Sequence, residues 1–79
     1  MTPKLKKLIK VDPKVRFGRP VIAGTRIPVE LIVGKIAGGM EIEAVRGEYD
    51  LTREQVLAAL QYAAAIVSPN QLRIRSAKH

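Results

Sequence analysis

The chain has 79 residues, 47% of them hydrophobic, and a formal net charge of +7. This length allows one small domain with a limited core, so stabilisation by a second copy or another partner is expected. There is no cysteine, and the single histidine is the last residue, which excludes disulfides and gives no support to zinc or thiol chemistry. No secretion signal or long apolar run is visible, so we expect a soluble cytoplasmic protein.

The charge is divided unevenly along the chain. Residues 1–26 hold eight basic residues against one acidic residue, whereas residues 27–67 hold three basic against six acidic residues. Residues 68–79 add three basic residues. A mildly acidic body between two basic ends favours an anionic partner that binds mainly to the ends. The alternative is that the ends serve only to keep the protein in solution.

A short β-ribbon is expected first. Residues 8–11 (LIKV) are suited to a strand, and the Asp12-Pro13 pair after them is typical of a turn. Residues 19–22 are expected to be the second extended segment, because Pro20 disfavours helical geometry at the residue before it.

The sequence GTRIP, which follows at residues 24–28, has two interpretations. In the structural one, Gly24-Thr25 forms a turn, and Arg26 caps carbonyls or pairs with an acid such as Glu30. In the functional one, Arg26 and Arg19 bind phosphate, which matches the geometry of a guanidinium group. The residues assigned to the structural motif are Gly18, Pro20, Gly24, Thr25, Arg26 and Pro28.

Two helices are expected after the ribbon. Pro28 suits the first helical position, where its missing N–H is not needed, and Gly38-Gly39 ends the first helix. The second helix is predicted over residues 41–48. The apolar spacing of three and four in the first helix forms one stripe: Val29, Ile32, Val33 and Ile36.

A third helix begins at the sequence TREQ, residues 52–55, which matches a capping box. Residues 68–70 (SPN) are expected to end it, because proline interrupts helices. Its core face is predicted to comprise Val56, Ala59, Leu60, Ala63 and Val67.

The predicted fold is mainly α with a small N-terminal β-ribbon. The three helices are expected to form a tri-helical, helix-turn-helix-like core of the homeodomain-like or winged type. Residues 1–79 are expected to form a single domain, with the core at 8–67 and a basic tail at 68–79.

Double-stranded DNA is the anionic partner that we consider first. Phosphate contacts need well-placed basic residues, which the N-terminal arm supplies, unless that arm is merely solvated. The third helix occupies the place of a recognition helix, although its mostly small and apolar content favours packing over base reading. The candidate nucleic-acid-binding residues are Lys4, Lys6, Lys7, Lys10, Arg19, Arg26, Arg53 and Gln55.

Several short motifs together resemble a bacterial family of proteins of unknown function, domain of unknown function 433. They are Val11-Asp12-Pro13, Gly18-Arg19-Pro20-Val21-Ile22, Gly24-Thr25-Arg26-Ile27-Pro28-Val29, Gly39-Met40, Tyr49, Leu51-Thr52, Ala58-Ala59-Leu60 and Tyr62-Ala63. The resemblance covers residues 8–67. It implies a small helix-turn-helix-like protein of the antitoxin type, encoded beside a ribonuclease toxin with a PIN-like fold. The chain departs from the family pattern at Glu41-Ile42, where many relatives have a serine-proline pair.

The preferred hypothesis is an antitoxin of a type II toxin–antitoxin pair that binds operator DNA and neutralises a PIN-like ribonuclease. The alternatives are a stand-alone DNA-binding regulator and an adaptor that binds an acidic protein. We expect no enzymatic activity, because no catalytic, metal-ligating or cofactor-binding constellation is present, and hence no catalytic residue, metal or cofactor.

Two partner contacts are predicted. A homodimer is expected to form through Ala58, Ala64 and Ala65, the small residues outside the core stripe. The tail is expected to become extended against the toxin, with arginines two residues apart on one face. The alternative for the tail is a disordered basic end. The tail residues assigned to partner binding are Leu72, Arg73, Ile74 and Arg75.

Overall fold

The computed structural model of the chain describes residues 3–14 and 16–78, with side chains described for residues 4–14 and 17–67. Helices make up most of this part of the chain, and a two-stranded antiparallel ribbon lies near its N-terminus. The predicted fold class, mainly α with a small N-terminal ribbon, is confirmed. The elements in order are α1 (Pro3–Leu8), β1 (Ile9–Lys10), the 3₁₀ turn η1 (Arg16–Gly18), β2 (Val21–Ile22), α2 (Val29–Ala37), α3 (Ile42–Tyr49) and α4 (Arg53–Lys78).

The ribbon forms in the predicted part of the chain. Ile9 of β1 is paired with Ile22 of β2 in antiparallel register, and both side chains are buried. The chain then turns back, so that the Ile22 N–H donates to the Ile27 carbonyl at 2.9 Å and Val21 bridges Pro28. The ribbon therefore delivers the chain directly to the start of α2.

The N-terminal segment is not the free basic arm that its charge suggests, because residues 3–8 form helix α1. Leu5 is buried in the core and Leu8 is partly buried against it. These two residues are three apart, so they lie on the same face of a helix, and this face packs against α4. The lysines between and beside them remain exposed to solvent.

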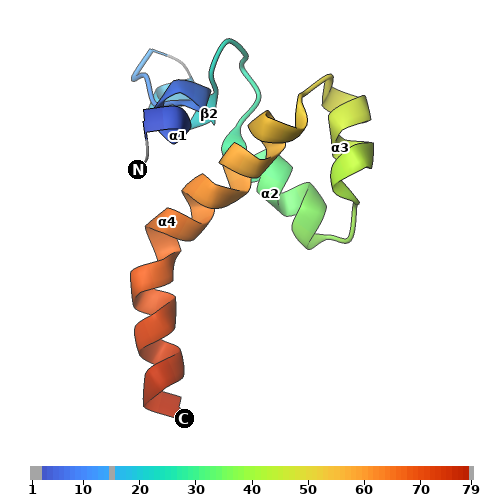
Figure 1. The fold of residues 1–79 in the computed structure, drawn as a ribbon. Helices are drawn as coiled ribbons and strands as arrows, with labels where there is room; N and C mark the ends of the chain where they lie inside the picture. Colours follow the sequence, from blue (N-terminus) through green and yellow to red (C-terminus); the bar gives the residue numbers. More distant parts are fainter. Residues whose placement is uncertain (1–2, 15, 79) are drawn as a thin grey trace.

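The core lies between α2, α3 and the first half of α4. Figure 1 shows α2 lying against α4, with α3 on one side and with α1 and β2 on the other. The most completely buried large side chains are Ile22, Ile32, Val45 and Val56, each at 0% exposure, and Val21 at 1%. Each of these elements thus contributes an apolar residue to one continuous cluster.

The ends of α2 are set by proline and glycine. Pro28 has an extended ψ of 140° and precedes the helix as its N-cap, so the prediction that it is the first helical residue is wrong by one position. At the other end, the Gly39 N–H donates to the Ile36 carbonyl and the Met40 N–H to the Lys35 carbonyl, both at 3.0 Å. This is a Schellman motif, and it requires the positive φ of 109° that Gly39 adopts.

The capping box at the start of α4 is confirmed. The Gln55 N–H donates to the Thr52 hydroxyl oxygen at 3.1 Å, and the Thr52 N–H donates to the Gln55 side-chain oxygen at 2.8 Å. Helix α3, in contrast, has Glu41 as its N-cap residue and no side-chain cap hydrogen bond; this is where the chain departs from the family pattern.

Two predictions about α4 are wrong. The helix does not end at residues 68–70 but continues to Lys78; a proline can kink a helix without ending it, and Figure 1 shows α4 bent, with its second half extending away from the other elements. Its buried face also differs from the predicted stripe, because Ala58 is 1% exposed whereas Val67 is 48% exposed. Contacts with α1, α2 and α3 widen the buried face of the first half and do not reach its later turns.

Within the described residues, no helix has both the length and the apolar content needed to cross a membrane.

The capping box gives the first testable prediction. Thr52→Ala removes the acceptor for the Gln55 N–H and should lower the free energy of unfolding by about 1 kcal/mol. Thr52→Ser keeps a hydroxyl group and should stay within a few tenths of a kcal/mol of the native chain. Urea unfolding followed by circular dichroism measures both, and equal stability of the two variants would contradict the role of the cap.

Candidate nucleic-acid interface

One side chain makes two hydrogen bonds within the GTRIP turn. The Thr25 hydroxyl donates to the Ile22 carbonyl at 2.7 Å and accepts a hydrogen bond from the Ile27 N–H at 3.0 Å. Gly24, just before it, has a φ of 81°, a conformation that glycine adopts without strain. Thr25 and Gly24 therefore fix the backbone that leads into Arg26.

Arg26 lies beside an open hollow at this turn. Lys10, Val21, Gly24, Thr25 and Arg26 line a space of about 530 Å³. Lys10 reaches it because β1 pairs with β2, with Lys10 opposite Val21. The ribbon thus brings together two of the predicted nucleic-acid-binding residues, which are sixteen positions apart in the sequence.

The expected pairing of Arg26 with Glu30 does not occur. Instead, the Glu30 carboxylate lies 2.7 Å from the Arg19 guanidinium. The cause is the Val29 N–H, which donates to the Pro20 carbonyl at 3.0 Å and so places the first turn of α2 beside Arg19. Among the residues whose side chains are described, Arg26 has no ion-pair partner.

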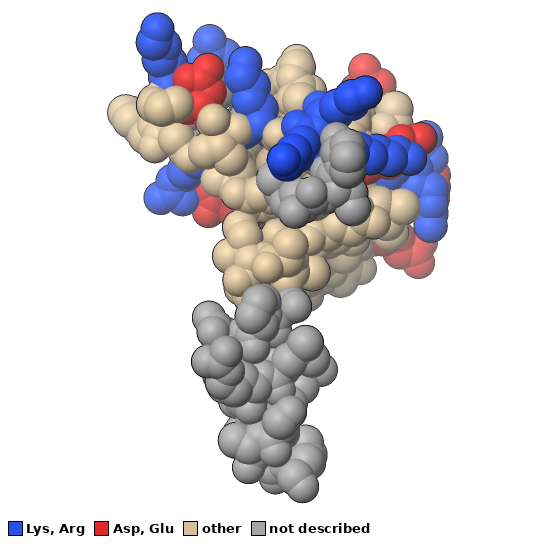
Figure 2. Space-filling view, turned by 60° about the vertical axis from the view of Figure 1, so that its left-hand side comes forward, with Lys and Arg blue, Asp and Glu red and all other residues tan. Residues whose placement is uncertain are grey.

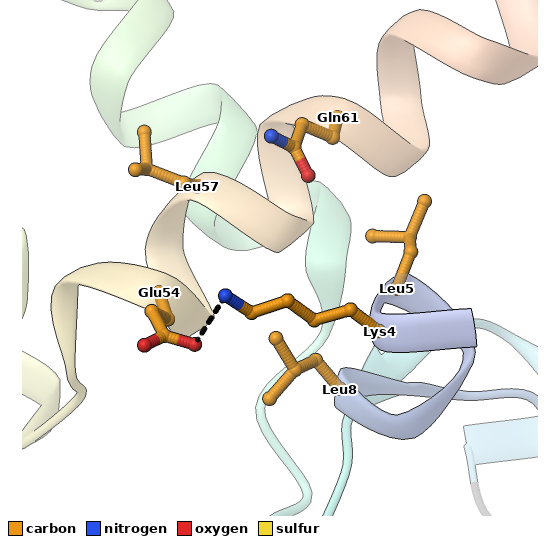
Figure 3. A pocket seen from close by; sticks show the side chains of 6 residues that line it. All are labelled: Lys4, Leu5, Leu8, Glu54, Leu57 and Gln61. Carbon is orange, nitrogen blue, oxygen red and sulfur yellow. Dashed lines mark ion pairs between the residues drawn. The ribbon is translucent and has the colours of Figure 1, made fainter. Parts of the chain in front are cut away.

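Lys4 is turned toward the protein. Its Nζ lies 3.1 Å from the Glu54 carboxylate of α4, and Figure 3 shows this pair beside a small hollow that Leu8, Leu57 and Gln61 also line. Both partners are largely exposed, so the pair contributes little to stability. It nevertheless neutralises Lys4, which separates this lysine from the other basic residues of α1.

The two candidate nucleic-acid-binding residues at the start of α4, Arg53 and Gln55, also interact with other groups of the protein. Arg53 lies 3.3 Å from the Glu43 carboxylate of α3, which also pairs with Arg46 at 2.7 Å. The Gln55 side chain belongs to the capping box. Reading bases with Gln55 would therefore require the first turn of α4 to lose part of its cap.

Positive charge without a close partner is concentrated on α1 and the ribbon. Lys6 and Lys7 are exposed and have no ion pair with any side chain that the structure describes, while Lys10 is 3.9 Å from Asp12. Figure 2 shows basic side chains projecting from the upper part of the protein, whereas the surface from which α4 leaves the body carries no charged side chain in this view. We therefore regard Lys6, Lys7, Lys10 and Arg26, here called the basic face, as the candidate interface.

The other ionisable groups that the structure describes form no competing site. The pKa of Tyr49 is raised above its usual 10, first by a hydrogen bond to the Glu48 carboxylate and then by burial, so this phenol stays protonated near neutral pH. No group of three metal-ligating side chains occurs within the part of the chain that the structure describes.

Sequence reasoning missed an apolar groove between α2 and α4. It has a volume of about 360 Å³, and the exposed residues Ile66 and Val67 border it. The signal in the sequence was the adjacent pair Ile66-Val67, which one helical stripe could not bury entirely. The other lining residues are Pro20, Val29, Glu30, Val33, Gly34, Tyr62 and Ala63.

The predicted partner-binding residues, 72–75, lie outside the residues whose side chains are described. Their backbone belongs to α4 in the chain without a partner, so the prediction that the tail becomes extended against a toxin stays a prediction. Positions two apart do not share a face of a helix, so Arg73 and Arg75 would act from one face only in the extended form.

Comparison with known proteins gives a family and named relatives. The model of a family described as protein of unknown function (DUF433) matches residues 9–63. A protein of Mycobacterium tuberculosis strain H37Rv with the name "Putative antitoxin VapB45" is 32% identical over 57 residues, which cover 72% of this chain and 24% of that protein.

A solved structure is also similar. The X-ray crystal structure of Rv2018 from Mycobacterium tuberculosis has a TM-score of 0.63 and 29% sequence identity, with 73% of this chain and 28% of that chain covered. This chain therefore spans about a quarter of the length of the relatives that it matches.

The turn gives the second prediction. Thr25→Val keeps the shape of the side chain but removes both hydrogen bonds, and it leaves the Ile27 N–H without this acceptor. The free energy of unfolding should fall by about 1–2 kcal/mol, whereas Thr25→Ser should retain most of the native value. Thermal unfolding measures the difference; a valine variant as stable as the native chain would show that the turn does not depend on the hydroxyl.

Proposed function

This chain belongs to the DUF433 family, and we propose that it is the antitoxin of a type II toxin–antitoxin pair that also binds operator DNA. The observation that carries the antitoxin part is the 32% identity to a protein named as an antitoxin, over 57 residues that make up 72% of this chain. The observation that supports the DNA part is the basic face, in which Lys6, Lys7 and Arg26 have no ion pair with any described side chain and Lys10 has only a long one, 3.9 Å from Asp12.

The ribbon supplies a rigid phosphate contact in this proposal. Arg26 presents a planar guanidinium that matches two phosphate oxygens, and the Thr25 hydrogen bonds hold its backbone in place. Because little backbone freedom remains to be lost, binding costs less entropy than it would in a mobile loop. Lys10 adds a second charge to the same hollow, and the exposed lysines of α1 extend the contact.

The start of α4 has a smaller part. In a helix-turn-helix arrangement, α3 and α4 would be the paired helices and the first turn of α4 would face the major groove. Arg53 is 58% exposed, and an exposed ion pair is worth at most about 1 kcal/mol, so Arg53 can exchange Glu43 for a phosphate group. We assign it to the DNA backbone and assign Gln55 to the cap.

The DNA-binding protein is proposed to be a homodimer, because operators read by helix-turn-helix proteins are commonly two-fold symmetric. Of the three alanines predicted for the dimer contact, Ala58 is buried within its own chain and takes no part. Ala64 and Ala65 remain exposed.

The third prediction tests the basic face against duplex DNA. The change of Lys6, Lys7, Lys10 and Arg26 to Gln should weaken binding to the DNA upstream of the gene. It should also lower the salt-dependence slope by about 0.9 for each phosphate group that the variant no longer neutralises. Lys4→Gln is the matched control on the same helix, because Lys4 already has an acidic partner. Fluorescence anisotropy at several salt concentrations measures affinity and slope.

Arg53→Gln separates the basic face from α4. It should reduce affinity less than the fourfold variant does. If it abolished binding while the fourfold variant bound normally, the interface would have to be moved to the start of α4. A chain that bound no DNA at low salt would favour the adaptor alternative.

The fourth prediction concerns the nuclease partner. The described core of the chain ends before residue 68, so deletion of residues 71–79 should leave the unfolding transition and DNA affinity nearly unchanged. It should relieve inhibition of a PIN-like ribonuclease encoded beside the gene. Nuclease assays with the full and shortened chains measure this, with Arg73→Gln and Arg75→Gln as milder variants. A shortened chain that inhibited as well as the full chain would exclude the tail as the inhibitory element.

A further inference from the structure

The apolar groove between α2 and α4 has the composition of a buried surface but is open. Two of its residues, Ile66 and Val67, are 57% and 48% exposed, so large apolar side chains face solvent beside a space of about 360 Å³. Its one charged lining residue is Glu30, which is already paired with Arg19. Covering such a surface with another apolar surface lowers the free energy, because apolar area is removed from water.

Gly34, which lines the groove, is the second unusual feature of this surface. It lies inside α2, where glycine is less favourable than any residue except proline, and a Cβ atom built there would meet nothing within 4 Å. Packing within the chain therefore does not require glycine at this position. A partner that lies against the groove could come close to the backbone of α2 here, because Gly34 has no side chain.

Most of the other glycines have reasons inside the chain. Gly24 and Gly39 have positive φ angles, and a Cβ atom at Gly38 would lie 3.3 Å from the Gly34 carbonyl oxygen. Gly47 in α3 is as open as Gly34, and nothing in the structure explains it. Gly34 is distinguished from Gly47 by its place in the groove.

Charge restricts where a second copy of this chain could meet the first. The chain carries a net charge of +7, so two copies repel each other, and the repulsion is smallest when they meet through a surface that carries no unpaired charge. The groove is such a surface, and in Figure 2 the region from which α4 leaves the body shows no Lys, Arg, Asp or Glu. The basic face lies on other elements, α1 and the ribbon, and so remains free.

Shape supports the same occupant. A two-fold axis brings identical patches together, so each patch must contain both a cavity and the side chains that fill it. The groove and the exposed pair Ile66-Val67 are neighbours on one face. We infer that the α2–α4 groove is the contact surface between two copies of this chain, in which Ile66 and Val67 of each copy enter the groove of the other beside Gly34. This rests on the homodimer of the proposed function and does not depend on DNA or on a nuclease.

The fifth prediction tests this surface by sedimentation equilibrium. The native chain should be a dimer at about 100 μM, far above the dissociation constant of a stable complex. Gly34→Leu fills the groove and Ile66→Glu places a charge in it, so each should raise the dissociation constant at least about 100-fold. Circular dichroism should show native helix content in both variants, since neither residue is buried in the core. Val11→Glu is the matched control, because Val11 is 53% exposed and does not line the groove; it should leave the dimer unchanged.

Cross-linking gives a second measurement. The chain has no cysteine, so a mixture of Gly34→Cys and Ile66→Cys chains should form a mixed disulfide dimer on oxidation. Replacing the Ile66→Cys chain with Gln61→Cys, a change at an exposed position outside the groove, should abolish that product.

The outcomes are distinguishable. A native chain that is monomeric at about 100 μM would overturn the dimer of the proposed function and this inference with it. A dimer that persists in both Gly34→Leu and Ile66→Glu would overturn the interface and leave the proposed dimer standing. If the native chain were monomeric and Gly34→Leu impaired nuclease inhibition, the groove would belong to the nuclease and the second copy would be excluded as its occupant.

Discussion

Burial of the first half of α4 is the constraint on which the other features depend. Ala58 and Ala59 are 1% and 0% exposed, and their small side chains let neighbouring elements approach one helix closely. Contacts with α1, α2 and α3 all converge on α4. These elements cover the first half of α4. They leave its later turns, which carry Ile66 and Val67, exposed to solvent.

The same convergence decides which charged residues are free to bind a partner. Two elements that pack against α4 supply opposite charges near its start: α1 brings Lys4 to Glu54 and α3 brings Glu43 to Arg53. These exposed pairs add little to stability, but they neutralise the positions from which a recognition helix would act. The basic residues of the basic face lie elsewhere, on α1 and the ribbon.

Sequence reasoning succeeded where the cause was local. The capping box of Thr52 and Gln55 and the glycine stop at Gly39 depend on residues within one turn, so their spacing was sufficient. It failed where the partner was distant: Glu30 pairs with Arg19 because a backbone hydrogen bond ties Val29 to Pro20, which no local pattern reveals. The burial of Ala58 was not predicted, for a related reason. Periodicity gives the direction of one apolar stripe on a helix but not the number of elements that surround the helix.

The candidate site was foreseen in part for the same reasons. Arg26 and Lys10 were chosen separately for their charge, and the register of the ribbon brings them to one hollow. The groove was not foreseen because an open cavity arises only when two helices are placed relative to each other. Short helices were also hard to predict: α1 has six residues, too few for a repeating pattern, and its two leucines become a signal only when α4 is present to receive them.

The two proposed contacts differ in physical kind, and this difference separates them experimentally. The basic face binds through ions, so added salt weakens it by competing for phosphate. The groove is apolar, so salt does not compete with it, and screening reduces the repulsion between two copies that each carry +7. Rising ionic strength therefore acts on DNA binding and on self-association in opposite directions. A dimer held through the apolar groove therefore persists under conditions in which each phosphate contact is weak.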